Sequence, residues 1–191
     1  AYISRMRFIQ RWALMRNTAP ENVQEHSHQV AVLAHALAVI RNERFGGRVD
    51  AGAVAAAALY HDASEILTGD MPTPVKYKNE ALRSAYKAVE QESARLMASL
   101  QPEALRSETE EFLTGRVLND AERKILKAAD RLSALIKCLE ECQSGNREFE
   151  AAREQQLAAL HGMDCPEAEY FITHILPCYT QNLDELTRGR F

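Results

Sequence analysis

The sequence predicts an all-α fold, arranged as a single domain of about seven to nine helices over residues 1–191. Apolar residues recur every three or four positions along most of the chain, which is the spacing of helices with one buried face. No segment alternates apolar and polar residues in the way that a half-buried β-strand does. The length is sufficient for one hydrophobic core and favours one domain over two. We see no repeat, low-complexity segment or linker.

The first long helix is predicted to begin at Thr18. The Thr18 hydroxyl can cap a helix, Pro20 suits the first turn, and Glu21 lies three residues after the cap. His26 is in helical phase with apolar residues, namely Val23, Val30, Leu33 and Leu37. It therefore lies on the inward stripe, where an ionisable side chain needs a buried partner. The segment Phe45-Gly46-Gly47 ends this helix, because paired glycines suit a C-terminal cap and turn.

The second helix is predicted from a cap at Asp50, through Tyr60, to Glu65. It is rich in alanine, whose small side chain allows neighbouring helices to approach closely. The segment Gly69–Pro74 then ends the helical stretch, because a glycine and two prolines cannot continue it.

Five more helices follow, each with an apolar face. They are predicted at residues 79–100, from about residue 102, from a cap at Asp120 to before Gly145, at residues 148–160, and from Pro166 onward with a break at Pro177. In the helix that Asp120 caps, Asp130 lies between Leu126 and Ala134 on a face that is otherwise apolar. A buried aspartate must be paired or bound to a cation. Asp130 is therefore a candidate ligand of a cation.

Composition and charge exclude several classes of function. Apolar residues make up 46% of the chain and charged residues 26%, as in ordinary globular proteins. The formal net charge is -4 with no basic block, so we expect no nucleic-acid polymer as partner, although a few placed Arg or Lys residues can hold one phosphate. No apolar run approaches the ~20 residues that a membrane span requires. The N-terminus also lacks the pattern of a signal peptide.

The cysteines favour free thiols in a reducing cytosol, and they are Cys138, Cys142, Cys165 and Cys178. Cys138 and Cys142 lie four positions apart on a predicted helix and can share one face. No other Cys or His lies nearby to complete a zinc-like set. We therefore expect a cytoplasmic protein with free cysteines.

The most informative motif is the dipeptide His61-Asp62, followed by Glu65. One metal ion can take an imidazole nitrogen and a carboxylate oxygen from such a pair, although a His-Asp pair alone is more often exposed than a ligand set. His26 and Asp130 add a second imidazole and a second carboxylate from separate helices. A mixed N/O set suits a divalent first-row metal with open positions for water and substrate. The combination indicates metal-assisted hydrolysis.

A helix-borne His, a His-Asp pair and a distant inward Asp resemble the HD-domain superfamily of metal-dependent phosphohydrolases. The resemblance implies an HD-type helical bundle that binds a divalent metal ion, such as cobalt, manganese or a similar metal. The ligands that it implies are His26, His61, Asp62 and Asp130.

The number of metal ions can also be argued from histidines. HD-type sites with two metals generally take further histidines between the His-Asp pair and the last aspartate, and residues 63–129 contain none. One metal ion per chain is therefore favoured. His28 and His35 remain as possible extra ligands, but His28 points to another side of its helix than His26, and a non-ligand role is favoured for both.

Longer motifs resemble the bacterial 5′-deoxynucleotidase family. They are Arg11–Asn17, Glu21–Ser27, Tyr60–Tyr77, Lys127–Asp130 and Leu135–Glu141. The similarity covers most of the chain and is densest from residue 11 to residue 77. It implies hydrolysis of deoxyribonucleoside 5′-monophosphates to deoxyribonucleoside and phosphate, with selection against ribonucleotides, by a homodimer.

The same resemblance implies roles for individual residues. Arg11 would orient the substrate phosphate, because a fixed cationic fork suits a phosphoryl group. Trp12 would pack against the sugar so that a 2′-hydroxyl has no room, and Glu65 would activate or position water or move a proton. The turn Asp70-Met71-Pro72-Thr73 would contact the nucleoside, with Asp70 near the 3′-hydroxyl. The metal ligands that would also contact substrate are His26, Asp62 and Asp130.

Plainer interpretations stay open at this point. A lone Trp in a helical domain is usually a core residue, Arg11 and Glu65 can be solvated, and Asp70 can be a turn-former. Two other functions also remain: another HD hydrolase, acting on a nucleoside triphosphate, a cyclic nucleotide or an alarmone, and a non-catalytic nucleotide-binding HD module. The absence of extra histidines and of a long basic insert argues against the first. The intact ligand set with Glu65 argues against the second.

Overall fold

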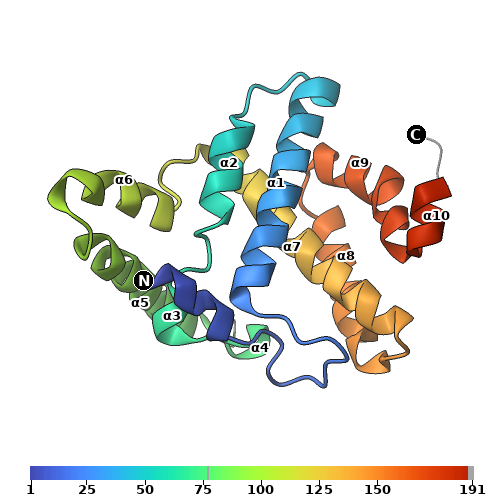
Figure 1. The fold of residues 1–191 in the computed structure, drawn as a ribbon, viewed down its shortest axis with the longest axis horizontal. Helices are drawn as coiled ribbons and strands as arrows, with labels where there is room; N and C mark the ends of the chain where they lie inside the picture. The colour runs from blue at the N-terminus through green and yellow to red at the C-terminus, as the bar shows by residue number, and fades with distance from the viewer. Residues whose placement is uncertain (77, 189–191) are drawn as a thin grey trace.

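The structure, a computed structural model, describes residues 1–76 and 78–188; Tyr77 and the side chain of Thr73 lie outside the description. The described part is all-α, as predicted, and its seven helices of at least seven residues are α1 (Val23–Phe45), α2 (Ala51–Ala58), α5 (Glu80–Ser99), α6 (Glu103–Leu113), α7 (Asp120–Gln143), α8 (Glu150–His161) and α9 (Pro166–His174) (Figure 1). The shorter helices are η1 (Ile3–Phe8), α3 (Glu65–Thr68), α4 (Thr73–Lys76), η2 (Arg147–Phe149), η3 (Leu176–Thr180) and α10 (Leu183–Arg188). The only β-type pairing among these residues is an isolated bridge between Gln10 and Asn22.

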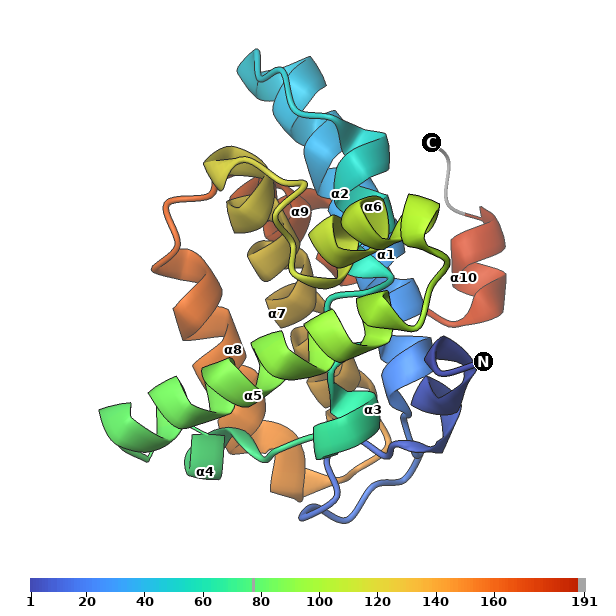
Figure 2. The same cartoon turned by 90° about the vertical axis from the view of Figure 1, so that its left-hand side faces the viewer.

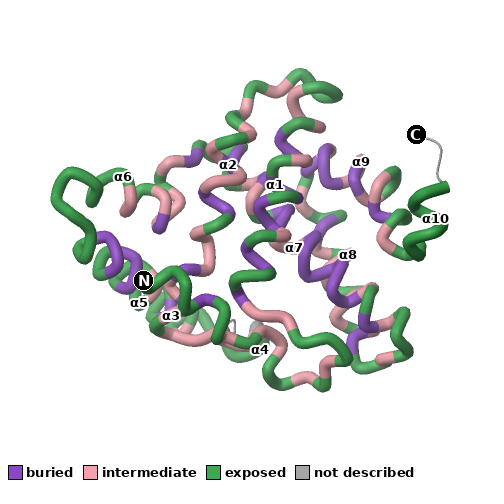
Figure 3. The backbone as a smooth tube through the Cα atoms, viewed as in Figure 1, coloured by how far each residue is buried: buried purple, intermediate pink, exposed green. Residues whose placement is uncertain are grey.

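The main core forms between α1 and α7, which lie against each other in the middle of the molecule (Figure 1). Helix α1 also packs on α2 and α9, and α7 packs on α8. The buried residues that fill this core are apolar side chains at helical spacing, among them Leu33, Leu37, Leu132, Leu135 and Ile136. Figure 3 shows the buried backbone concentrated where these helices face each other.

A second, smaller apolar cluster joins η1, the start of α1, α5 and the end of α6. It consists of Met6, Val23, Ala63, Ala94, Met97, Ala98 and Leu113. Helix α5 packs on α6 and α3, and in Figure 2 it crosses in front of α7. The segment that follows α2 therefore links the main core to the small one.

Helix α1 begins at Val23, so the predicted start at Thr18 is wrong. Its cap is Asn22, whose side chain accepts from the backbone N–H of Glu25 at 3.0 Å in a capping box. The Thr18 hydroxyl instead donates to Glu141 at 2.7 Å. The predicted end is confirmed, because Gly46 caps the helix in the left-handed region with φ 65°.

The predicted cap at Asp50 is confirmed, since its side chain accepts from Ala53 N–H at 2.9 Å. The predicted cap at Asp120 is wrong by one residue, because Asn119 forms the capping box there. No helix within the described residues is long and apolar enough to cross a membrane. All four cysteines are free, as predicted.

The prediction of a continuous second helix from Asp50 to Glu65 is wrong, because α2 ends at Ala58. Residues 59–64 form turns in which hydrogen bonds span three residues, for example from Ala63 N–H to the Tyr60 carbonyl at 3.0 Å. Helix α3 then begins at Glu65. The His-Asp dipeptide is therefore presented by turns between two helices.

Candidate active site

His26 reaches the site from the buried face of α1, as predicted, and has no exposed surface. Its Nδ1 lies 3.0 Å from Oγ of Ser133 on α7. The Ser133 hydroxyl donates its own hydrogen to Oε1 of Gln29 at 2.6 Å, so its oxygen accepts from His26 Nδ1–H. Nε2 of His26 is left with its lone pair available, 3.1 Å from Oδ1 of Asp130 and 3.5 Å from Oδ2 of Asp62. A metal-binding imidazole is typically held in this way.

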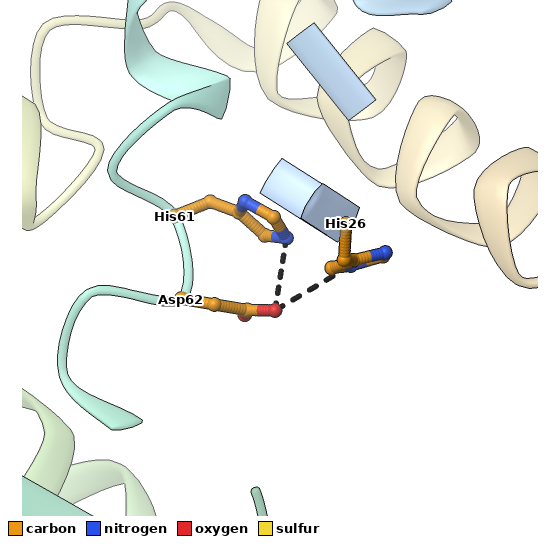
Figure 4. A group of neighbouring side chains, drawn as sticks. All are labelled: His26, His61 and Asp62. Carbon is orange, nitrogen blue, oxygen red and sulfur yellow. Dashed lines mark ion pairs between the residues drawn. The ribbon is translucent and has the colours of Figure 1, made fainter. Parts of the chain in front are cut away.

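His61 lies in the turns after α2 and faces His26, with ring centres 5.3 Å apart (Figure 4). Its Nδ1–H donates to the Ala58 carbonyl at 2.7 Å. This bond directs Nε2 toward Oδ2 of Asp62, which lies 3.2 Å away (Figure 4). Both imidazoles therefore present Nε2 to the same carboxylate oxygen.

The four candidate ligands predicted from the sequence come together in one group. His26, His61 and Asp62 each offer one ligand atom, and these atoms lie within 4.8 Å of one another. Oδ1 of Asp130 lies 4.0 Å from Nε2 of His61. The expectation that Asp130 is buried is wrong, because 43% of its side chain is exposed. Here α7 borders a cavity instead of the core.

This donor set fits a divalent metal ion. Nε2 of His26 and Nε2 of His61 are buried, and neither makes a hydrogen bond to another described residue. Buried polar atoms without partners are unusual and destabilising, yet these two point at the same carboxylates. Two imidazoles and two carboxylates without a thiolate suit manganese, cobalt, iron or zinc.

The charges in the group act strongly on one another. Burial lowers the pKa of His61, but the carboxylates of Asp62 and Asp130 outweigh it and raise this pKa to about 9. Burial raises the pKa of Asp62, but the two histidines and Arg11 outweigh it and hold this pKa well below its usual range. Asp62 is therefore ionised at neutral pH, and its negative charge favours a cation beside it.

Glu65 is the first residue of α3 and is buried, with 5% of its surface exposed. Burial raises the pKa of its carboxyl to about 10, and the charges of Asp62 and Asp70 add to this. Oε2 of Glu65 has no hydrogen-bond partner within the described part of the chain. The interpretation as a solvated surface residue is therefore wrong. Burial and the neighbouring carboxylates therefore favour the protonated form of Glu65.

The loop between η1 and α1 brings Arg11 and Trp12 to this group. Nη1 of Arg11 lies 3.4 Å from Oδ2 of Asp62, and its Nε–H donates to Oε2 of Glu21 at 3.1 Å. The indole N–H of Trp12 donates to the same oxygen at 3.0 Å, and its ring packs on Phe149 with centres 5.4 Å apart. Trp12 has a left-handed backbone, φ 57°, which is rare for a bulky residue. Strain of this kind, about 1–3 kcal/mol, concentrates at functional sites.

The turn from Asp70 to Thr73 lies next to the Trp12 loop. Burial raises the pKa of the half-buried Asp70, whereas Arg11 and a hydrogen bond from the Trp12 backbone oppose the rise. Met71 and Pro72 are also half-buried. Asp70 is therefore more than a solvated turn residue, because it contacts the loop that carries Arg11.

A cavity of about 470 Å³ borders the group on the side of His61 and Asp130. It lies between α5, α7 and the segment after α2. The cationic side chains along its wall are Lys87, Arg95, Arg116, Arg123 and Lys127. Its volume is in the range of small-ligand pockets. Arg11, Trp12 and Asp70 do not line this cavity and gather on the Asp62 side of the group instead.

Two supporting residues were not predicted. Glu21 was assigned to a helix start, although it stands inside one of the recognised motifs. Ser133 lies three positions after Asp130 on α7. It is a polar residue on an apolar helix face, and this feature of the sequence could have indicated that it has a buried partner. His28 and His35 are exposed and lie outside the candidate ligand group, in agreement with the favoured non-ligand role.

This fold has counterparts among solved structures. An HD-domain phosphohydrolase from Listeria innocua matches with a TM-score of 0.82 and 28% identity, over 98% of this chain and 92% of that one. The HD phosphohydrolase of cyanophage S-2L, bound to dA and one catalytic Zn²⁺ ion, matches with a TM-score of 0.67 over 94% of each chain. At 18% identity, that likeness concerns the fold alone. The chain is thus an HD-domain phosphohydrolase by fold.

Within that class, the chain belongs to the YfbR-like 5′-deoxynucleotidase family, and the match to this family covers residues 1–179. The 5′-deoxynucleotidase YfbR of Escherichia coli is 45% identical over 188 residues, which make up 98% of this chain and 94% of that protein. A 5′-deoxynucleotidase of Vibrio vulnificus is 43% identical over 187 residues, 98% of this chain and 96% of that one. The family predicted from the sequence is confirmed.

Proposed function

We propose that this protein hydrolyses deoxyribonucleoside 5′-monophosphates to deoxyribonucleoside and phosphate, and that one bound divalent metal ion takes part. The observation that carries the proposal is that Arg11 lies next to the candidate metal ligands. Nη1 of Arg11 lies 3.4 Å from the Asp62 oxygen that also faces His26 and His61. A cationic fork beside a metal site suits a phosphate monoester. Relatives over nearly the whole chain are named 5′-deoxynucleotidases.

The metal ion would be held by His26, His61, Asp62 and Asp130. When bound, a divalent ion lowers the pKa of a coordinated water and neutralises negative charge on a phosphoryl group. Cobalt, manganese, iron and zinc all suit this N/O ligand set, and a cyanophage HD phosphohydrolase holds one catalytic Zn²⁺. These four ligand roles are supported by the convergence of the side chains and by the unsatisfied imidazole nitrogens.

Arg11 and Glu65 would act on the phosphate and on protons. Carboxylates surround the Arg11 guanidinium and hold its pKa far above its usual value even against burial, so it stays cationic and can bind phosphate oxygens. Burial and the carboxylates of Asp62 and Asp70 favour the protonated form of Glu65. It would donate this proton to the 5′-oxygen as the P–O bond breaks, and the carboxylate so formed would take up the proton that the attacking water loses. His26, Asp62 and Asp130 would lie in contact with the substrate phosphate as well.

Trp12 and the turn from Asp70 to Thr73 would bind the nucleoside. The indole of Trp12 is held at both its N–H and its ring face, so it can form a rigid wall against C2′ of the sugar. Asp70 would accept from the 3′-hydroxyl, while Met71, Pro72 and Thr73 would line the nucleoside. A ribose 2′-hydroxyl would then lose its hydrogen bonds to water without a partner, which costs about 1–3 kcal/mol.

The test is phosphate release from a panel of deoxyribonucleotides and ribonucleotides with several divalent metals. Deoxyadenosine 5′-monophosphate should exceed adenosine 5′-monophosphate in kcat/KM by roughly tenfold to several-hundred-fold. Trp12→Ala should reduce this ratio, even if both rates fall. A wild-type protein that hydrolyses neither nucleotide with any metal would refute the function. A ratio unchanged in Trp12→Ala would assign the sugar selectivity to the Asp70 turn.

The chain would work as one domain over residues 1–191, as a cytoplasmic homodimer. A continuous core through α1 and α7 supports the single domain. Analytical ultracentrifugation measures the number of chains in the assembly, and a monomer at micromolar concentration would contradict the dimer.

A further inference from the structure

One carboxylate oxygen joins the two residues to which the proposed function assigns the phosphate and the sugar. Oε2 of Glu21 accepts Nε–H of Arg11 at 3.1 Å and the indole N–H of Trp12 at 3.0 Å. The side chains of Arg11 and Glu21 are each only 12% exposed, so little water competes for these bonds. We propose that Glu21 is a positioning residue that sets the guanidinium and the indole relative to each other, and that it thereby couples phosphate binding to the choice of sugar. This inference rests on the proposed function.

The backbone fixes Glu21 opposite Arg11. Arg11 N–H donates to the Glu21 carbonyl at 2.9 Å, and Gln10 pairs with Asn22 in the isolated antiparallel bridge. Asn22 is also the cap of α1, the helix that carries His26. The position of the Glu21 carboxylate is therefore fixed relative to the helix that supplies a candidate metal ligand.

Glu21 orients the Arg11 fork without using the part that faces the site. The bond to Glu21 engages Nε, whereas Nη1 lies on the side of Asp62. A planar guanidinium held at Nε has a defined plane, which is what recognition of a phosphate by two parallel hydrogen bonds requires.

Glu21 also supplies the hydrogen-bond acceptor for the indole N–H of Trp12. An indole N–H can only donate, and Glu21 is its acceptor. The left-handed backbone of Trp12 is rare for a bulky side chain and must be held by its surroundings. The residue is held by this hydrogen bond, by the ring of Phe149 and by the hydrogen bond from its backbone to Asp70. Its carbonyl also accepts from Met15 N–H at 2.9 Å and from Asn17 Nδ2 at 3.2 Å.

Replacement of Glu21 should therefore affect both substrate contacts. In Glu21→Ala, kcat/KM on deoxyadenosine 5′-monophosphate should fall about 10–100-fold, because misplacement by about 1 Å has effects of this size. The preference over adenosine 5′-monophosphate should fall about tenfold. Glu21→Gln keeps an oxygen that can accept the indole N–H, so its preference should stay within about threefold of the wild type.

Fluorescence gives a readout that is independent of turnover, because Trp12 is the single tryptophan of the chain. In metal-free protein without nucleotide, Glu21→Ala should shift the emission to longer wavelength and increase quenching by acrylamide. Glu21→Gln should change both much less. The matched control is Glu148→Ala, which removes a carboxylate that pairs with Arg16 of the same loop at 3.0 Å, and it should leave emission and sugar preference unchanged.

A double-mutant cycle decides whether Glu21 acts through the indole. Trp12→Phe removes the N–H but keeps an aromatic ring, and it should lower the sugar preference on its own. In this background, Glu21→Ala should change the remaining preference by less than about twofold, because the hydrogen bond is already lost.

An unchanged sugar preference in folded Glu21→Ala protein would overturn the proposal, whatever its emission. If Glu21→Ala does not fold, an unchanged preference in Trp12→Phe would overturn it in the same way. If the wild type hydrolyses no deoxyribonucleotide, the proposed function fails, and the fluorescence comparison still decides whether Glu21 holds Trp12.

Discussion

Helix α7 carries two charged groups about two turns apart, and they differ in whether their polar atoms are satisfied. In its C-terminal half, Lys137 pairs with Glu141, and the two side chains are only 4% and 1% exposed. Glu141 also accepts from the N–H and the hydroxyl of Thr18 at 2.9 and 2.7 Å and from Nδ2 of Asn146 at 2.8 Å. This group is saturated with hydrogen bonds, and it anchors the loop that continues from Trp12.

The group around Asp130 is charged and mostly buried as well, but it is unsatisfied. Nε2 of His26, Nε2 of His61 and Oε2 of Glu65 have no hydrogen-bond partner among the residues described. Buried polar groups that have all their hydrogen-bond partners define a conformation, whereas buried donors and acceptors without hydrogen bonds are available for a ligand. The contrast predicts that one group holds the loop in place and that the other binds and reacts.

Loss of the metal ion should give the largest effect on activity and a small effect on folding. Chelation, or His61→Ala, should reduce phosphate release by at least about 10³-fold, because a bound divalent ion contributes several kcal/mol to phosphoryl transfer. The fold should persist, since the saturated group and the core do not involve this residue. The measurements are phosphate release, metal content by elemental analysis, and thermal unfolding. Full activity in verified metal-free protein would contradict the prediction.

Glu65→Gln should separate chemistry from binding. The amide has the shape of the carboxyl, and Glu65 is not one of the candidate ligands, so stability should hardly change and metal content should stay near that of the wild type. Loss of a proton-transfer group should lower kcat by roughly 10²–10⁴-fold. Steady-state kinetics at saturating substrate measures this, and a variant that keeps most of its kcat would exclude Glu65 from proton transfer.

Glu141→Ala should show the opposite pattern. It leaves Lys137 buried without its partner, and breaking a buried pair in this way costs about 3–5 kcal/mol. Urea unfolding of metal-free protein should show this loss in the free energy of unfolding, while the folded protein still binds metal. Glu148→Ala, which breaks an exposed pair with Arg16, is the control and should lose at most about 1 kcal/mol. Equal losses in the two variants would contradict the structural role of Glu141.

The pH dependence of stability gives the smallest effect. Burial raises the pKa of Glu141, but hydrogen bonds from Lys137, Asn146 and Thr18 outweigh it and hold this pKa well below its usual range. A pKa lowered by folding adds stability above the unfolded value of about 4.3, and this stability is lost as the pH falls toward the folded value. The stability difference between wild type and Glu141→Gln should therefore shrink below about pH 4.3, by up to about 1.4 kcal/mol per pH unit. If the free energies of unfolding of the two proteins change in parallel with pH, this prediction is contradicted.

The fold class and the candidate ligands were predictable because each ligand breaks a local pattern. His26 and Asp130 are ionisable residues on apolar helix faces, and the His61-Asp62 dipeptide adds a motif that is informative only beside them. The structure brings all four together. The family resemblance supplied the rest of the prediction, since nothing local distinguishes Arg11, the residue that we propose binds phosphate, from a surface arginine.

The errors arose where long-range partners override local signals. Thr18 has the features of a helix cap, but its hydroxyl and N–H bind Glu141, which lies 123 positions later in the chain. The apolar residues around Asp130 predict a core position, but the neighbouring elements leave a cavity in front of it. Glu21 was missed because its contacts are with two side chains that the loop folds back onto it.

The turns at residues 59–64 limit how the His-Asp pair can be transplanted to other scaffolds. Neighbouring side chains on an α-helix point about 100° apart, so a continuous helix directs one of the two away from a shared ion. Here the tight turns let Nε2 of His61 and Oδ2 of Asp62 approach to 3.2 Å. A design that grafts the dipeptide into the middle of a helix should therefore gain one ligand. A graft at a helix end followed by a tight turn should gain both.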